Sequence, residues 1–506
     1  MSTEGGPEPI TRGEVARGAG LAGLARAGAL IEAVAQPLYV WLFGLASYGI
    51  YVVLWGAVNL AANVVDLSMT SALQRIVPTA DGEERAHGAV KFALLISVIP
   101  AVLLALVATI EAEAVARLFS AAPEDSARLP QSIALFAWAL PLWTFVEVAT
   151  SAARARRAFG PEIRLRIFWE QVARILFALG FFLVGVGGGR GMMAAHLCSL
   201  AVTALLSVRL LARYYDLGLL LRAPIGKPLG RLVLVTGLAL LPANLARRLL
   251  IDAPPLVLNL MLPGARGASA AGLFEIARKI STVPHIVRQA FQYVLGPLSA
   301  AQAKADRSAI GPLYHFASRV STALVVPLGG LLIFAGADIL SVYRPEVAAA
   351  LPLLWVLVAA RVAEAIVGPA ATLVEMTGHR LLPLVNSLGG VALWAGLAIL
   401  LTPRWDAFGM AVAVAAGTLI SSYAATLELR ISDGLWPFDR KLLQGLGIAL
   451  AGFAGMALAD SLTRGAIGFA AILLLWAATS WLALRYGLTR DDRLALGGLS
   501  RRLRLV

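Results

Sequence analysis

The stretch FGLASYGIYVVLWGAVNLAANVVDLSMTSALQR, residues 43–75, decides the fold because an uncharged apolar run gives way to a polar end. No charged residue occurs between Phe43 and Val65, and this segment is long enough to cross a bilayer as a helix. Asp66 follows the apolar run, and Arg75 closes the stretch. The pattern predicts a transmembrane helix that ends near Asp66 and leads into a basic loop.

Apolar segments of this kind recur along the whole chain. Its 506 residues are 59% hydrophobic and 14% charged, whereas soluble domains are about 45–50% apolar and about 25% charged. The sequence therefore predicts an all-α polytopic membrane protein with about 14 transmembrane helices. The segments are 19–42, 47–69, 92–111, 131–152, 167–187, 191–212, 233–262, 269–296, 316–336, 350–376, 384–402, 406–427, 442–461 and 465–485.

Positive charge is unevenly distributed between the alternating loops. With the N-terminus in the cytoplasm, 28 of the 43 Lys and Arg residues flank the cytoplasmic side and 7 flank the opposite side. This asymmetry follows the positive-inside rule, so both termini are expected in the cytoplasm. The basic loops account for the net charge of +13 without a nucleic-acid partner, and they favour contact with anionic membrane lipids.

The residues that hold metals or form disulfides are sparse. Cys198 is the only cysteine, so an intrachain disulfide and a cysteine metal cage are excluded. His196 and His285 stand alone, without the spacing of metal ligands, and are expected to be satisfied buried histidines. We expect neither a metal nor another cofactor.

Two pairs of landmarks indicate an internal repeat. Gly-Ile-Tyr at 49–51 corresponds to Gly-Leu-Phe at 272–274, an offset of 223 residues. A Gly followed by Arg recurs at Gly160 and Gly378, an offset of 218. The similar spacing predicts two pseudo-symmetric six-helix bundles of parallel orientation around a central cavity. The expected parts are a cytoplasmic tail (1–18), an N-terminal bundle with its cytoplasmic linker (19–231), a C-terminal bundle (232–430), and two additional transmembrane helices with a basic tail (431–506).

Basic residues occur inside the predicted helices. At the bilayer centre each would cost about 2.5–3.5 kcal/mol if it faced lipid. We therefore expect most of them to face protein or water. They are Arg26, Arg174, Arg247, Arg248, Arg278, Lys279, Arg288 and Arg361.

Two predicted helices carry these residues on one side. At 100° per residue, one side of the segment 233–262 carries Asn244, Arg247, Arg248 and Asn259. The pair Pro254 and Pro255 predicts a bend in this segment. The segment 269–296 carries a polar stripe that we expect to line the cavity. The stripe consists of Arg278, Ser281, His285, Arg288 and Gln292.

Structural roles are alternatives for several of these residues. Arg247 and Arg248 could extend to the membrane edge instead of entering a cavity. Asp66, at the end of its helix, is a candidate coupling residue, but acids at such positions more often anchor a loop. Two pairs have the spacing of helical ion pairs: Arg361 with Glu364, and Glu170 with Arg174.

The stretch 43–75 resembles the opening of the oligosaccharide flippases of the multidrug, oligosaccharidyl-lipid and polysaccharide exporter (MOP) superfamily. That family usually has Gly after the Asp-Leu pair, where this chain has Ser68. The acid common in its seventh helix is not at the usual position; Pro255 stands near it and Asp252 lies slightly upstream. The matching residues are Gly44, Tyr48, Gly49, Tyr51, Asp66, Ala72 and Arg75, followed in the second half by residues 272–280, Pro297, Ser299, residues 344–360, Gly378 and Arg380.

The resemblance implies a transporter and not an enzyme. Such flippases move undecaprenyl-diphosphate-linked oligosaccharide from the cytoplasmic to the periplasmic leaflet of the bacterial inner membrane by alternating access. The product would be exopolysaccharide or lipopolysaccharide, with a polysaccharide polymerase and glycosyltransferases as partners. A surplus of cations suits a diphosphate. The candidate cavity residues are Arg26, Asn244, Arg247, Arg248, Arg278, Lys279, His285, Arg288 and Gln292; Asp66, Arg361 and Glu364 are candidates for coupling or ion pairing.

Two alternatives remain open at this point. The same superfamily contains lipid II flippases and multidrug antiporters, and an intramembrane cation surplus disfavours only cationic drugs. A membrane-embedded glycan polymerase or glycosyltransferase would need catalytic acids or bases on an outer loop. The longest outer loop, residues 112–130, contains Glu113, Glu124 and Asp125 without such an arrangement.

Overall fold

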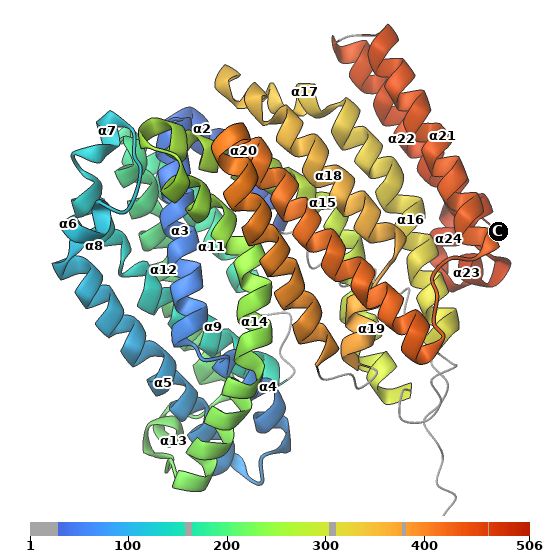
Figure 1. The fold of residues 1–506 in the computed structure, drawn as a ribbon. Coiled ribbons are helices and arrows are strands. Elements are labelled where there is room, and N and C mark those ends of the chain that lie inside the picture. The colour runs from blue at the N-terminus through green and yellow to red at the C-terminus, as the bar shows by residue number, and fades with distance from the viewer. Residues whose placement is uncertain (1–28, 157–163, 303–309, 377–380, 464, 506) are drawn as a thin grey trace, which may run out of the picture.

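The computed structural model describes residues 29–156, 164–302, 310–376, 381–463 and 465–505. Within these ranges the chain is built of helices and has no strand (Figure 1). Ten of the described helices are long and apolar enough to cross a membrane. The chain is therefore a multi-pass membrane protein of the all-α class.

The first bundle, here called the N-lobe, ends with α12, and the short helix α13 follows it. Most of its long helices run between two ends of the molecule. α4 and α13 lie at one end, the bottom of Figure 1, which we call the basic end; α7 and α17 lie at the opposite end. The elements are α2 (Ala29–Phe43), α3 (Leu45–Val65), α4 (Met69–Ile76), η1 (Val77–Thr79), α5 (Glu83–Ile110), α6 (Ala112–Ala116), α7 (Pro123–Ser126), α8 (Leu129–Phe136), α9 (Ala139–Ala155), the π-helical turn η2 (Arg164–Trp169), α11 (Glu170–Leu183), α12 (Gly188–Tyr214) and α13 (Leu217–Arg222).

The second bundle, the C-lobe, runs from α14 to α20 and is followed by a C-terminal extension. α20 consists of two helices joined at a kink, because Trp405 and Asp406 leave the helical region of φ and ψ. The C-lobe elements are α14 (Lys227–Met261), α15 (Gly264–Gln302), α16 (Ile310–Phe334), α17 (Gly336–Leu340), η4 (Pro345–Ala350), α18 (Leu351–Ile366), α19 (Ala370–Met376) and α20 (Leu382–Asp433); those of the extension are α21 (Arg440–Leu462), α22 (Gly465–Gly487), α23 (Arg490–Ala495) and α24 (Gly498–Arg502).

Most predicted segments coincide with these helices, and the differences are local. The segments 384–402 and 406–427 are the two parts of α20. The prediction of one helix over 350–376 is wrong, because Gly368 has a φ of +65° and Pro369 follows it, so α18 ends before them and α19 begins after them. α14 contains Pro242, Pro254 and Pro255 and still runs as one helix.

The two helices that carry the repeat landmarks cross each other. A Cβ added to Gly49 of α3 would lie 1.8 Å from the carbonyl oxygen of Ala268 in α15. A Cβ added to Gly272 of α15 would lie 3.0 Å from the carbonyl oxygen of Leu45. The lobes therefore meet backbone to backbone at these two glycines, a contact that larger residues would prevent.

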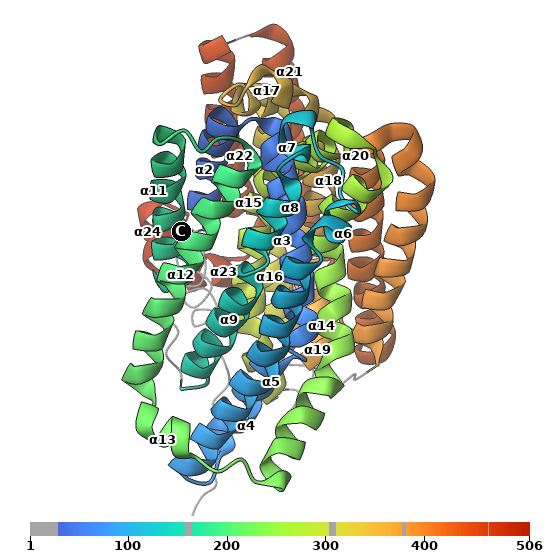
Figure 2. The same ribbon diagram turned by 90° about the vertical axis from the view of Figure 1, so that its left-hand side faces the viewer.

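α14 contacts both lobes along its length (Figure 2). Near its start it packs against α4 and α5, and a Cβ on Gly237 would lie 2.6 Å from the carbonyl oxygen of Leu67. Further along it packs against α3 and α20, and a Cβ on Gly56 would lie 2.8 Å from the carbonyl oxygen of Asp252. A shift of α14 would therefore change its contacts with helices of both lobes.

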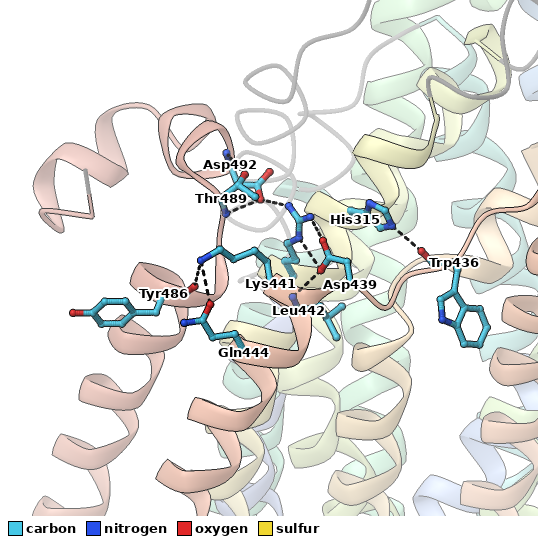
Figure 3. Close-up of polar contacts among 10 residues, drawn as sticks. His315, Trp436, Asp439, Lys441, Leu442, Gln444, Tyr486, Thr489 and Asp492 are labelled. Carbon is cyan, nitrogen blue, oxygen red and sulfur yellow. Dashed lines mark hydrogen bonds and ion pairs between the residues drawn. The ribbon is translucent and has the colours of Figure 1, made fainter.

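The C-terminal extension is joined to the C-lobe through α16. α21 and α22 pack against each other and against α16. Arg319 of α16 is 8% exposed and pairs with Asp439, which caps α21, and with Asp492 of α23 at 2.5 Å. Figure 3 labels the two acids, Asp439 and Asp492. Two acids of the extension therefore neutralise one buried cation of the bundle.

Candidate functional site

The polar stripe predicted for residues 269–296 lies on α15, and its first cation is paired. Arg278 donates to Glu275 through Nε at 2.7 Å and through Nη2 at 2.6 Å. The Lys279 ammonium lies 3.9 Å from the same carboxylate. Glu275 itself is buried. This part of the stripe is therefore a local cluster of two cations around one acid.

About three turns further along α15, Arg288 reaches a different helix. Its Nη2 lies 3.2 Å from Oε1 of Glu364 on α18, and Nη1 of Arg361 donates to Oε2 of Glu364 at 2.7 Å. The Ser422 hydroxyl of α20 donates to Oε1 at 3.0 Å. The predicted Arg361–Glu364 ion pair is thus present. We call Arg288, Arg361, Glu364 and Ser422 the C-lobe cluster.

The C-lobe cluster carries more positive than negative charge. Two guanidinium groups share one carboxylate, and their side chains are 11% and 19% exposed. The Nε of Arg288 is buried and has no hydrogen-bond partner among the described residues. His285 lies beside it, with Nδ1 3.4 Å from Nη2 of Arg288. An anion that reached this cluster would find an unused donor and an unbalanced cation.

The candidate residues of α14 divide into two groups. Asn244 donates to the hydroxyl groups of Ser68 and Ser71 at 3.1 and 3.2 Å, and Arg247 donates to Asn244 at 2.8 Å while remaining exposed. Arg248 lies 3.7 Å from Asp252 on its own helix. The first group therefore faces the N-lobe turn after α3.

Asp66 lies at this turn, directly after the last residue of α3. Its carboxylate accepts from the Thr70 hydroxyl at 2.9 Å and the Thr70 amide at 3.4 Å, and the Ser97 hydroxyl lies 3.3 Å away. Leu67 and Ser68 follow with φ of 48° and 59°. Position 68 is thus in the left-handed region, where the resembling family usually has Gly.

A second enclosed cluster lies within the N-lobe. Nη2 of Arg174 donates to Oε1 of Glu170 at 2.5 Å and contacts Nε2 of His196 at 2.7 Å. Because a guanidinium has no acceptor, Nε2 of His196 must accept, and its Nδ1 then carries the proton toward the Tyr51 hydroxyl at 3.0 Å. We call Tyr51, Glu170, Arg174 and His196 the N-lobe cluster.

Some polar residues of the structure were not predicted from the sequence, and some predicted residues lie outside the described part of the chain. Glu147 of α9, which pairs with Arg166 at 2.6 Å, was not singled out, although a lone acid inside an apolar helix is itself a signal. Ser422 gave no signal, because a serine in such a helix is common. Arg26 and the Gln292 side chain lie outside the described residues.

Comparison with solved structures identifies the fold. The chain matches a lipid II flippase, MurJ, in an inward closed conformation, with a TM-score of 0.72 at 12% identity over 92% of this chain and 97% of that one. It matches a MATE transporter in complex with MaL6, with a TM-score of 0.61 at 15% identity over 84% and 96%. It also matches a MOP superfamily transporter from Pyrococcus furiosus, with a TM-score of 0.62 at 14% identity over 85% and 98%.

The chain therefore has the fold of the MOP superfamily transporters. No protein-family profile and no curated protein sequence matches the chain.

Proposed function

We propose that this protein is a flippase that moves undecaprenyl-diphosphate-linked oligosaccharide from the cytoplasmic to the periplasmic leaflet of a bacterial inner membrane. The two-lobed fold, shared with flippases and exporters, supports transport by alternating access. The C-lobe cluster carries the proposal, because two arginines share the single carboxylate of Glu364 between helices α15, α18 and α20. The exported oligosaccharide would serve exopolysaccharide or lipopolysaccharide synthesis.

The chemistry of a diphosphate suits this cluster. Its oxygens carry negative charge and accept hydrogen bonds, and a guanidinium can bind two of them at once. The Nε of Arg288 has no acceptor in the part of the chain that the structure describes. Its Nη2 lies 3.2 Å from Oε1 of Glu364, farther than the 2.7 Å between Nη1 of Arg361 and Oε2 of Glu364. Arg288 can therefore exchange its acid for a phosphate while Arg361 keeps Glu364 neutralised.

A lipid II flippase is a second candidate, supported by the match to the lipid II flippase MurJ. Lipid II also carries a diphosphate on a polyprenyl chain, so the same arginines would serve it. A multidrug exporter for cations is disfavoured, because a surplus of arginines repels a cationic drug. The sugar attached to the lipid decides between the first two.

The test is transport by the purified full-length protein in vesicles, with fluorescent undecaprenyl-diphosphate oligosaccharide or fluorescent lipid II as cargo. We expect Arg288→Gln to reduce flipping strongly. The protein should stay folded, because Glu364 still pairs with Arg361. Arg288→Lys should retain part of the activity, since an ammonium attracts phosphate without the guanidinium fork. Arg85→Gln, which removes an exposed guanidinium near the basic end, is the matched control and should transport normally.

Full transport by a well-folded Arg288→Gln variant would remove the proposal. Transport of lipid II alone would replace the oligosaccharide with the second candidate. The mass of the recovered cargo tests the enzymatic alternative, because a flippase returns the molecule unchanged and a polymerase or glycosyltransferase alters its mass.

A further inference from the structure

Asp66 differs from the other buried acids of the protein. Five acids are buried in the part of the chain that the structure describes, and four have an arginine within 4 Å. Asp66 is 8% exposed, and none of the described lysines or arginines pairs with it. The four paired acids are Glu170, Glu275, Glu364 and Asp492.

The groups that face Asp66 come from four helices. Thr70 on α4 and Ser97 on α5 supply hydroxyl groups. Glu147 on α9 is a nearby carboxylate, and it is itself paired with Arg166. On α14 the charged group linked to this turn is Arg247, which donates to Asn244, and Asn244 in turn donates to Ser68. Within the described ranges, no cation therefore offsets an ionised Asp66 at contact distance.

The turn after Asp66 is strained and is packed directly against α14. Leu67 and Ser68 both have positive φ, a conformation that is unfavourable for residues other than glycine. The Leu67 carbonyl oxygen faces Gly237, where a Cβ would come within 2.6 Å of it. The Ser68 hydroxyl accepts from Asn244. If a change at Asp66 moves this turn, the turn must therefore shift its contact with α14, which contacts both lobes.

Opposing effects bring the two protonation states of Asp66 close in free energy. Asp66 lies beyond the last residue of the α3 span, in a buried position. Burial raises the pKa of its carboxyl from 3.8 to about 6, the Glu147 carboxylate adds to the rise, and hydrogen bonds from Thr70 and Ser97 oppose it. The carboxyl can therefore change its charge at a pH that cells reach.

We infer that Asp66 is a proton-binding site whose charge sets the contact between the turn at Leu67–Ser68 and α14. A proton from water bonds to one carboxylate oxygen and returns to water on release. The ionised group only accepts hydrogen bonds, whereas the protonated group must donate one, so Thr70 or Ser97 has to reorient. The site itself rests on these contacts, and its use in driving transport rests on the proposed function.

Infrared spectroscopy of the full-length protein in liposomes tests the site without any cargo, by following the carboxylic acid band between pH 4.5 and pH 8. We expect one buried carboxyl to titrate with a midpoint near pH 6. That signal should vanish in Asp66→Asn. It should remain in Asp81→Asn, the matched control, whose carboxylate is 91% exposed. An unchanged titration in Asp66→Asn would overturn the inference.

Two further variants keep the test decisive if Asp66→Asn does not fold. Ser97→Ala and Thr70→Val each remove a hydroxyl group that favours the ionised carboxyl, so each should move the midpoint upward by about one pH unit. A midpoint that stays in place in both variants would contradict the assignment.

Transport of the fluorescent cargo under an imposed pH difference then tests whether protonation of Asp66 is coupled to transport. A transport rate that does not change with the pH difference would contradict a role of Asp66 in coupling. It would not contradict the titration of Asp66 or the proposed cargo.

Discussion

The N-lobe cluster and the C-lobe cluster are both buried groups of arginine and glutamate, but they differ in enclosure and in balance. In the N-lobe cluster the side chains of Arg174 and Glu170 are 3% and 4% exposed, and one guanidinium faces one carboxylate. In the C-lobe cluster Arg288 and Arg361 are more exposed and share Glu364. The N-lobe cluster is therefore suited to holding α3, α11 and α12 together, whereas the C-lobe cluster is suited to binding an anion.

The same contrast extends to the two helices that the repeat makes equivalent. α3 carries no charged residue between its ends, whereas α15 carries Glu275, Arg278, Lys279 and Arg288. Both keep the glycine at which they cross. The repeat has therefore conserved the contact between the lobes within this one chain while the polar residues differ between its halves.

Removing one arginine from each cluster should separate the two roles most strongly. Arg174→Gln breaks a fully buried pair, so we expect a loss of stability of about 3–5 kcal/mol. Arg288→Gln leaves Glu364 with Arg361 and Ser422, so the loss should not exceed about 1.5–3 kcal/mol. Denaturation of the purified variants in detergent measures both. Equal losses would erase the distinction between the clusters.

An intermediate effect is expected where the lobes cross. Gly49→Ala places a Cβ against the backbone oxygen of Ala268, so the helices must separate, at a cost of about 1–3 kcal/mol. Gly272→Ala meets its nearest atoms at 3.0 Å and should be milder. A cysteine at Ala268, in a chain with Cys198→Ser, should react faster with a water-soluble thiol reagent in the Gly49→Ala background. Equal reactivity in both glycine variants would contradict this asymmetry.

The smallest effect is expected from the hydroxyl of Tyr51. Tyr51→Phe removes the hydrogen bond to His196 and keeps the ring, so stability should fall by about 1 kcal/mol. The equivalent position in α15 is already phenylalanine, Phe274, which is fully buried. Thermal melts of Tyr51→Phe beside the wild type provide the measurement, and an unchanged melt would show that the hydroxyl adds nothing to the N-lobe cluster.

The sequence predicts the helices of this fold well because their signal is local. Long apolar runs define most spans, and the glycines at 49 and 272 mark helices that cross in the structure. The exception at 350–376 has a local cause as well, since a Gly-Pro pair inside an apolar run breaks the helix without changing hydropathy.

The partners of the polar residues were less accessible from the sequence. Periodicity places Arg278 and Arg288 on one face of α15, but it does not show which helix that face meets. Periodicity therefore predicts one shared surface for Arg278 and Arg288, whereas the structure pairs Arg288 with Glu364 on α18. Pairs within one helix, such as Arg361 with Glu364, were found because three or four residues separate the partners.

The pairing of Arg319 with Asp439 and Asp492 sets a limit on how this protein can be shortened or could have been assembled in evolution. Removal of the chain from Asp439 onward would take away both carboxylates and leave a guanidinium of α16 buried without these counter-charges. It would also uncover apolar side chains of α16, because Leu313 and Phe316 belong to one buried cluster with Leu484 of α22 and with Leu488, which follows it. The last two membrane helices are consequently not a detachable module. A version of this chain without α21 and α22 would first need a neutral residue at position 319.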